Sequence, residues 1–343
     1  MGKLTYFEER NRKNNLAVGK YCENLPDFCY DFFIGIENTT SPLTRMNYAM
    51  DLSVFFNFLS EIYHKKPIEF TLVDINKIRS SHIEQFLSYL SFYEINGKML
   101  KNNDNGKKRK LSSVRSLFKY LYNHNLINSN EASKIATPKL HQKEIIRLEK
   151  DEVAKLFNTV EGAEGFSHRQ KVYNKNTLER DNAIITLFLG TGIRISELVG
   201  LNIDDFDFSQ NAFVVTRKGG SRSTLYFSDE VAQALKTWLI KRKTLELEEN
   251  EKAMFISLQN KRITVRAVEN LVKKFAKQAV PLKKISPHKL RSTFGTELYR
   301  ETKDIYIVAD VLGHKDVNTT KKHYAAISED MRKDVANKVN LRK

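Results

Sequence analysis

Apolar residues at helical spacing constrain the fold of this chain more than any other feature of its sequence. Ser41 and Pro42 are typical of a helix start, and residues 41–64 then place their apolar side chains on one face. The same pattern returns after Ser80 and again near residue 111. The apolar positions of the three segments are Tyr48, Leu52, Phe55, Phe56 and Leu59, then Ile83, Phe86, Leu87 and Leu90, then Leu111, Val114, Leu117, Phe118 and Leu121. Because an amphipathic helix must bury its apolar face, this part is predicted to be a small helical bundle.

Between the last two of these helices we expect a loop from Asn102 to Lys110. It carries four consecutive basic residues, Lys107 to Lys110. Such a run can contact phosphates or can simply be a solvated stretch of charge, and taken alone the second interpretation is favoured.

The second part of the chain mixes helical and β-type patterns. The periodicity lapses around Ala136 and restarts at Leu148, which predicts a linker. Residues 161–180 are polar and are interpreted as a surface insertion, whereas residues 183–189 are almost wholly apolar and predict a buried helix. Two β-type runs, 213–216 and 224–227, flank Gly219 and Gly220 and predict a hairpin. The predicted fold class is therefore mainly α with a small β-sheet.

The charge balance of the chain is basic. Lys and Arg number 57 against 41 Asp and Glu, a formal net charge of +16, and both halves share the excess. Distributed positive charge suits a protein that wraps a polyanion, because each neutralised phosphate releases condensed counterions. A merely basic soluble protein explains the charge equally well.

Cysteine content and hydropathy bear on the cellular compartment. Cys22 and Cys29 have no Cys or His partners at zinc spacing and are interpreted as reduced thiols. No apolar run approaches the roughly 18 residues that span a bilayer, and no signal-peptide pattern follows Met1. We therefore expect a soluble, cytoplasmic protein of about two domains.

Four short segments carry residues suited to chemistry on a phosphate, and each alone is a weak signal. In the first, a glycine-bearing turn places Arg194 at the start of a helix, three residues before Glu197. Anions bind at helix N-termini, and a guanidinium fork there adds to the attraction. A surface arginine paired with Glu197 at helical spacing is the equally weighted alternative.

The other three segments have similarly plain alternatives. Arg217 and Lys218 stand at the predicted hairpin tip, where a lysine can donate a proton or simply belong to a basic turn. His288 and Arg291 lie one helical turn apart and can converge on one phosphate. The fourth segment runs from Leu312 to Tyr324. Taken singly, its histidine is usually structural and its tyrosine usually part of a core.

Taken together and in this order, the segments resemble the signature of the tyrosine recombinase and integrase family. The matching residues are the arginine box Arg194 to Leu198, the hairpin Lys218, His288 with Arg291, Leu312 to His314, and Tyr324. Among the 14 tyrosines Tyr324 is chosen because it lies ten residues after His314 in a Thr-Thr context, whereas Tyr299 and Tyr306 precede that box. The resemblance covers the chain from about residue 147 onward and, more loosely, the helical part before it.

The resemblance implies a role for each residue. Tyr324 would attack DNA and become covalently joined to it, and Arg194 and Arg291 would stabilise the extra negative charge of the phosphorane-like state. His288, with the arginines, would help the phenol lose its proton. Lys218 would protonate the leaving 5′ oxygen and His314 would hydrogen-bond the phosphate. Glu197 would orient a catalytic neighbour. No cofactor, metal or ATP is expected.

The resemblance also implies an organisation. Residues 1–35 are an N-terminal extension, 36–138 a helical core-DNA-binding domain, 139–146 a linker, and 147–343 a mixed α+β catalytic domain. After Ser328, Met331, Val335 and Val339 mark a last helix that docks on a neighbouring subunit or packs on its own domain. The family implies a clamp around duplex DNA and a homotetramer on paired recombination sites, with accessory proteins possible. The reaction would pass through a Holliday junction.

The pathway implied is DNA integration or excision, or chromosome dimer resolution, with a leaning toward the Xer-like or simple mobile-element kind. Two other functions stay open on the sequence alone. A type IB topoisomerase shares much of this chemistry but relaxes supercoils without site specificity, and a catalytically idle DNA-binding regulator could keep the same fold.

Overall fold

The computed structural model describes residues 4–95, 97–138, 146–162, 165–217, 220–249, 251–314 and 316–317. The chain divides into two compact units, residues 1–143 and 144–343, called the N-terminal and C-terminal units below. Four predicted features lie wholly or almost wholly outside the described residues, namely the linker at 139–146, Lys218, Tyr324 and the helix after Ser328.

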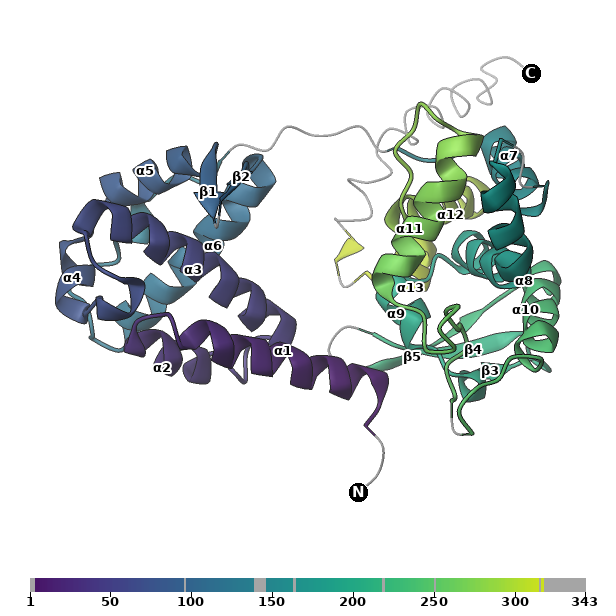
Figure 1. Cartoon of the computed structure of the whole chain (residues 1–343), viewed down its shortest axis with the longest axis horizontal. Coiled ribbons are helices and arrows are strands. Elements are labelled where there is room, and N and C mark those ends of the chain that lie inside the picture. The colour runs from purple at the N-terminus through teal and green to yellow at the C-terminus, as the bar shows by residue number, and fades with distance from the viewer. Residues whose placement is uncertain are drawn as a thin grey trace, which may run out of the picture. The chain divides into compact units, whose positions relative to one another are not determined.

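The N-terminal unit is a bundle of helices with one small hairpin (Figure 1). Its elements are α1 (Tyr6–Cys22), α2 (Asp27–Gly35), α3 (Pro42–Tyr63), η1 (Pro67–Glu69), α4 (Leu72–Lys77), α5 (Ser80–Tyr89), β1 (Tyr93–Ile95), β2 (Lys98–Leu100), α6 (Asp104–Asn123) and η2 (Glu131–Lys134). Helix α3 begins where Ser41 accepts a hydrogen bond from the Thr44 N–H, with Pro42 in its first turn. The predicted helix at 41–64 is confirmed.

An aromatic core holds the N-terminal unit together. Phe55 is fully buried and makes edge-on contacts with Phe56, Phe86 and Phe118 from three helices, with ring centroids 5.0–6.4 Å apart. All the rings lie at the positions that the helical periodicity marked as apolar. Aromatic pairs in this geometry add about 0.5–1.5 kcal/mol each beyond the area they bury.

The predicted loop from Asn102 to Lys110 is wrong over most of its length. Helix α6 begins at Asp104, where the Asn103 side chain accepts a hydrogen bond from the Gly106 N–H. Lys110 is buried and its Nζ lies 3.0 Å from Asp51 Oδ1, while Arg109 reaches the same carboxylate at 2.7 Å. The basic run is therefore helical, and half of it neutralises a buried acid on α3.

The C-terminal unit is also mainly helical, with a three-stranded sheet along one side of its helices (Figure 1). Its elements are α7 (Lys150–Gly162), α8 (His168–Thr191), α9 (Ile195–Gly200), η3 (Ile203–Asp205), β3 (Phe206–Asp207), β4 (Ala212–Thr216), β5 (Arg222–Tyr226), α10 (Asp229–Arg242), α11 (Val265–Ala279), α12 (Pro287–Thr302) and α13 (Ile305–Leu312). The predicted fold class, mainly α with a small β-sheet, is confirmed.

The sheet is antiparallel in the order β3-β4-β5. Strands β4 and β5 form the predicted hairpin, in which Val214 pairs with Thr224 and Thr216 with Arg222. Phe213 and Val215 are buried on one face, as the alternation of an antiparallel sheet with one covered face requires.

The interpretation of residues 161–180 as a surface insertion is wrong for its second half, which forms the first half of α8. Asn174 is buried and donates to the Val160 carbonyl, and Arg180 binds Asp181 and the Ile256 carbonyl. These polar side chains are buried because each has a partner. The predicted buried helix at 183–189 is confirmed as the apolar second half of α8.

Among the described residues, none of the helices combines the length and apolar character needed to cross a membrane.

Candidate active site

A glycine turn after α8 sets the position of the first candidate residue. Gly192 has a φ of +61°, a conformation that favours glycine. A Cβ at this position would lie 2.4 Å from a ring carbon of Phe294 and 2.9 Å from a methyl of Leu312. The turn can therefore approach α12 and α13 only because residue 192 has no side chain.

Arg194 caps α9 and reaches across to α13. Its main-chain N–H donates to Glu197 Oε2 at 3.0 Å, and its guanidinium donates to Glu197 Oε1 at 2.9 Å and to the Gly313 carbonyl at 2.9 Å. The Arg194 side chain is 32% exposed, so these contacts do not enclose it fully. The prediction that Arg194 lies at a helix start is confirmed. The alternative interpretation, an arginine paired with Glu197, is confirmed as well, because Arg194 does both.

Glu197 binds a second arginine that comes from the hairpin. Arg217 Nη1 lies 3.4 Å from both carboxylate oxygens, and its Nη2 donates to the Val311 carbonyl at 3.3 Å. The Arg217 side chain is 10% exposed and that of Glu197 only 2%. One buried carboxylate thus fixes two guanidiniums, and its loss would leave two cations close together without their counter-ion.

Arg291 supplies a third guanidinium from α12. It is 4% exposed and donates to the carbonyls of Gly192 and Leu312. His288 lies one turn earlier on the same helix and is exposed. The predicted spacing of this pair is confirmed, and the contacts of Arg291 place it beside the turn that carries Arg194.

The end of α13 is where the three arginines meet. Carbonyl oxygens in the last turn of a helix lack intrahelical partners and carry partial negative charge. Here those of Val311, Leu312 and Gly313 accept from Arg217, Arg291 and Arg194 respectively. Three positive side chains from α9, β4–β5 and α12 are thereby gathered around one helix terminus.

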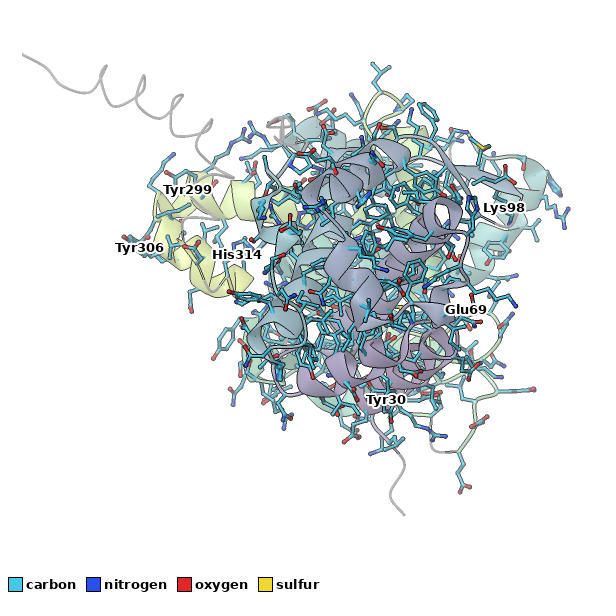
Figure 2. The ribbon with its side chains drawn as sticks, turned by 90° about the vertical axis from the view of Figure 1, so that its left-hand side faces the viewer. Tyr30, Glu69, Lys98, Tyr299, Tyr306 and His314 are labelled. Carbon is cyan, nitrogen blue, oxygen red and sulfur yellow. The ribbon has the colours of Figure 1, made fainter. Side chains whose placement is uncertain are left out.

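His314 follows directly on this terminus. Its main-chain N–H donates to the Ala309 carbonyl at 2.9 Å, which completes the helix cap. In the view of Figure 2, His314 appears close to Tyr299 of α12 and Tyr306 of α13. Tyr306 is 70% exposed, so exposure alone does not distinguish the nucleophile among these tyrosines.

The structure therefore brings Arg194, Arg291 and the Gly313–His314 turn together. It does not describe Lys218 or Tyr324. Sequence reasoning noticed Arg217 only as part of a basic tip and missed its burial against Glu197. No local signal marks that contact, because Glu197 is 20 residues away and Val311 is 94.

A Gly313→Ala variant is expected to weaken the site. Gly313 has a φ of +59°, and an added Cβ would lie 2.8 Å from the Arg217 guanidinium carbon. A non-glycine residue in this conformation costs on the order of 1–3 kcal/mol, and the clash would push Arg217 aside. We expect slower DNA cleavage with a modest drop in thermal stability, measured by single-turnover cleavage and calorimetry. Unchanged cleavage would show that the cap tolerates a side chain.

The family models that match this chain cover most of its length. The model described as phage integrase family matches residues 146–331, and the one described as phage integrase, N-terminal SAM-like domain, matches residues 30–125. A protein named tyrosine recombinase XerC from Caldanaerobacter subterraneus subsp. tengcongensis is 35% identical over 340 residues, covering 96% of this chain and 90% of that protein. One of the same name from Natranaerobius thermophilus is 32% identical, covering 90% and 96%.

Solved structures resemble the chain in fold. A crystal structure of the XerH site-specific recombinase bound to palindromic difH substrate, a post-cleavage complex, has a TM-score of 0.67 at 18% identity and covers 95% of this chain and 96% of its own. A structure of a lambda integrase dimer bound to a core site has a TM-score of 0.58 at 16% identity, covering 84% and 94%.

Proposed function

This chain belongs to the phage integrase family of tyrosine recombinases, site-specific enzymes that cleave and rejoin DNA, and we propose that Tyr324 is its nucleophile. The observation that carries the proposal is the convergence of Arg194, Arg217 and Arg291 on the α13 terminus, from which the chain runs on to Tyr324 ten residues after His314.

The chemistry assigns a task to each proposed residue. The Tyr324 phenol oxygen attacks the scissile phosphorus as the bond to the 5′ oxygen breaks, which leaves a 3′-phosphotyrosyl bond and a free 5′ hydroxyl. A free tyrosine phenol has a pKa near 10, so the nucleophile needs help to lose its proton, and His288 together with the arginines supplies that help. Lys218 donates a proton to the departing 5′ oxygen.

Arginine suits the stabilising role because it stays cationic at every physiological pH and offers a planar fork of donors to phosphate oxygens. Arg194 and Arg291 are held in place before DNA arrives, by Glu197 and by fixed carbonyls. Preorganised donors of this kind stabilise developing charge with little reorganisation. His314 would add a hydrogen bond to the same phosphate.

The wider architecture follows the same proposal. The N-terminal unit binds one face of duplex DNA and the C-terminal unit the other, and four protomers on two sites exchange strands through a Holliday junction. The helix after Ser328 links neighbouring subunits. The relatives named tyrosine recombinase XerC favour the Xer-like kind. We propose that the protein acts in the cytoplasm, with or without accessory proteins.

Assays of recombination, adduct formation, supercoil relaxation and DNA binding separate this function from its rivals. The target site is first recovered by selecting bound fragments of the host chromosome. A plasmid carrying two copies of that site should then recombine, and a nicked suicide substrate made from it should trap a covalent adduct. Relaxation of supercoiled plasmids that lack the site would instead indicate a type IB topoisomerase. Binding without any adduct would indicate a catalytically idle regulator.

A further inference from the structure

The Arg217 side chain is largely enclosed by its neighbours. Its side chain is 10% exposed, and its guanidinium contacts both oxygens of Glu197 and the carbonyls of Val311 and Leu312. Arg222, which stands on the opposite strand of the same hairpin, is exposed. A basic hairpin tip that only attracted DNA would gain nothing from burying one of its arginines.

The backbone of Arg217 is fixed as firmly as its side chain. Its N–H donates to the Ser221 carbonyl at 2.7 Å, and its carbonyl accepts from the Gly220 N–H at 3.0 Å. These two bonds close the turn that contains Lys218. Because consecutive residues are covalently joined, anchoring Arg217 at both main chain and side chain restricts where Lys218 can lie.

The anchor points belong to the rest of the active site. Glu197 is the carboxylate that also holds Arg194, and Val311 and Leu312 lie in the helix end whose carbonyls bind Arg194 and Arg291. The crowding is tight enough that a Cβ on Gly313 would lie 2.8 Å from the Arg217 guanidinium. Any shift of the hairpin relative to the phosphate-binding arginines therefore has to break these contacts first.

We propose that Arg217 is a positioning residue that docks the β4–β5 hairpin onto Glu197 and the α13 terminus and so holds Lys218 at the leaving 5′ oxygen. This inference rests on the proposed role of Lys218 as proton donor. It predicts that losing Arg217 impairs the same chemical step as losing Lys218, although the Arg217 guanidinium contacts Glu197 and the α13 carbonyls.

The test compares two leaving groups in one nicked suicide substrate built from the recovered site. In one version the scissile bond joins phosphorus to the normal 5′ oxygen, and in the other to sulfur. A thiol has a pKa of about 8.5, far below that of an alcohol, so a thiolate leaves without a proton donor. The measured quantity is the ratio of the single-turnover cleavage rates on the sulfur and oxygen substrates for the full-length protein.

Lys218→Ala should cleave the oxygen substrate about 10²–10⁴-fold more slowly than the unmodified protein and recover on the sulfur substrate. Arg217→Gln should show the same pattern, a raised sulfur-to-oxygen ratio. Arg222→Gln, which removes one positive charge from the same hairpin, should leave the ratio unchanged whatever it does to DNA affinity. Arg217→Lys should bring the sulfur-to-oxygen ratio part of the way back to that of the unmodified protein, since lysine keeps the positive charge but lacks the planar fork of guanidinium donors.

Each other result contradicts a distinct part of the inference. If Lys218→Ala is rescued by sulfur but Arg217→Gln is equally slow on both substrates, Arg217 does not act through Lys218 and the inference is overturned while the role of Lys218 stands. If sulfur fails to rescue Lys218→Ala, the proposed proton donor is wrong and the inference is overturned with it. A folded Arg217→Gln variant with an unmodified rate on oxygen also overturns it, and circular dichroism establishes that folding.

Discussion

Replacing Tyr324 with phenylalanine is expected to abolish the covalent adduct between protein and DNA, and all recombination with it. The change removes one hydroxyl oxygen, the atom that attacks phosphorus in the proposed mechanism. DNA binding should persist, because the arginines that we propose to hold the phosphate are untouched. The measurement is a denaturing gel of the nicked suicide substrate, alongside a mobility-shift titration.

Tyr306→Phe is the matched control for this experiment. Tyr306 is exposed on α13 and close to His314 along the chain, so it serves as the alternative nucleophile. It should form the adduct at the unmodified rate. An adduct that persists in Tyr324→Phe and vanishes in Tyr306→Phe would show that Tyr306 on α13 is the nucleophile.

Arg291→Gln is expected to slow cleavage by at least about 10²–10³-fold, the usual cost of removing one preorganised donor from a developing oxyanion. The variant should also lose stability, because the Gly192 carbonyl is left buried without its donor, at a cost of about 1–3 kcal/mol, and the Leu312 carbonyl keeps only its 3.5 Å contact with Arg217. Single-turnover cleavage and urea unfolding measure the two effects separately.

Arg300→Gln provides the comparison on the same helix. Arg300 pairs with Glu149 and Glu297 at a half-buried surface position, and nothing in the mechanism assigns it a task. The substitution should lower stability only slightly, because ion pairs near the surface contribute little to it, and it should leave cleavage unchanged. Equal losses of cleavage rate and stability in Arg291→Gln and Arg300→Gln would mean that Arg291 contributes only to the fold.

Much of the helical architecture could be predicted from periodicity alone. Helices α3 and α5, the apolar half of α8 and the β4–β5 hairpin lie where the patterns indicated, because in each a buried apolar face repeats at the spacing of its secondary structure. Arg194 was likewise found at a helix start, since a glycine turn and a residue pair at helical spacing are both local signals.

The parts that sequence reasoning got wrong depend on partners far away in the chain. Lys110 was assigned to a loop because it belongs to a charged run, yet Asp51, 59 residues earlier, allows it to be buried in a helix. Arg180 was assigned to the surface, yet it is buried. The distant Ile256 carbonyl and the adjacent Asp181 accept its hydrogen bonds. A hydrophobic pattern cannot show which charges will find partners, and it therefore places paired charges at the surface.

The same limit applies to the site. The family signature named Arg194, Lys218, His288, Arg291, His314 and Tyr324 by order and spacing, and their roles stay predictions. Arg217 belongs to no such pattern. Its contact with Glu197 and the α13 terminus became visible only when the hairpin and the helix end were placed side by side.

Identification of the DNA-linked peptide tests the central claim most directly. The adduct trapped on a suicide substrate would be digested with nuclease and trypsin, and the phosphotyrosyl peptide sequenced by mass spectrometry. Cleavage after Lys322 and Arg332 yields a peptide in which Tyr324 is the sole tyrosine. We predict that this peptide carries the nucleotide remnant on Tyr324. A remnant on Tyr299, Tyr306 or any other residue would contradict the account.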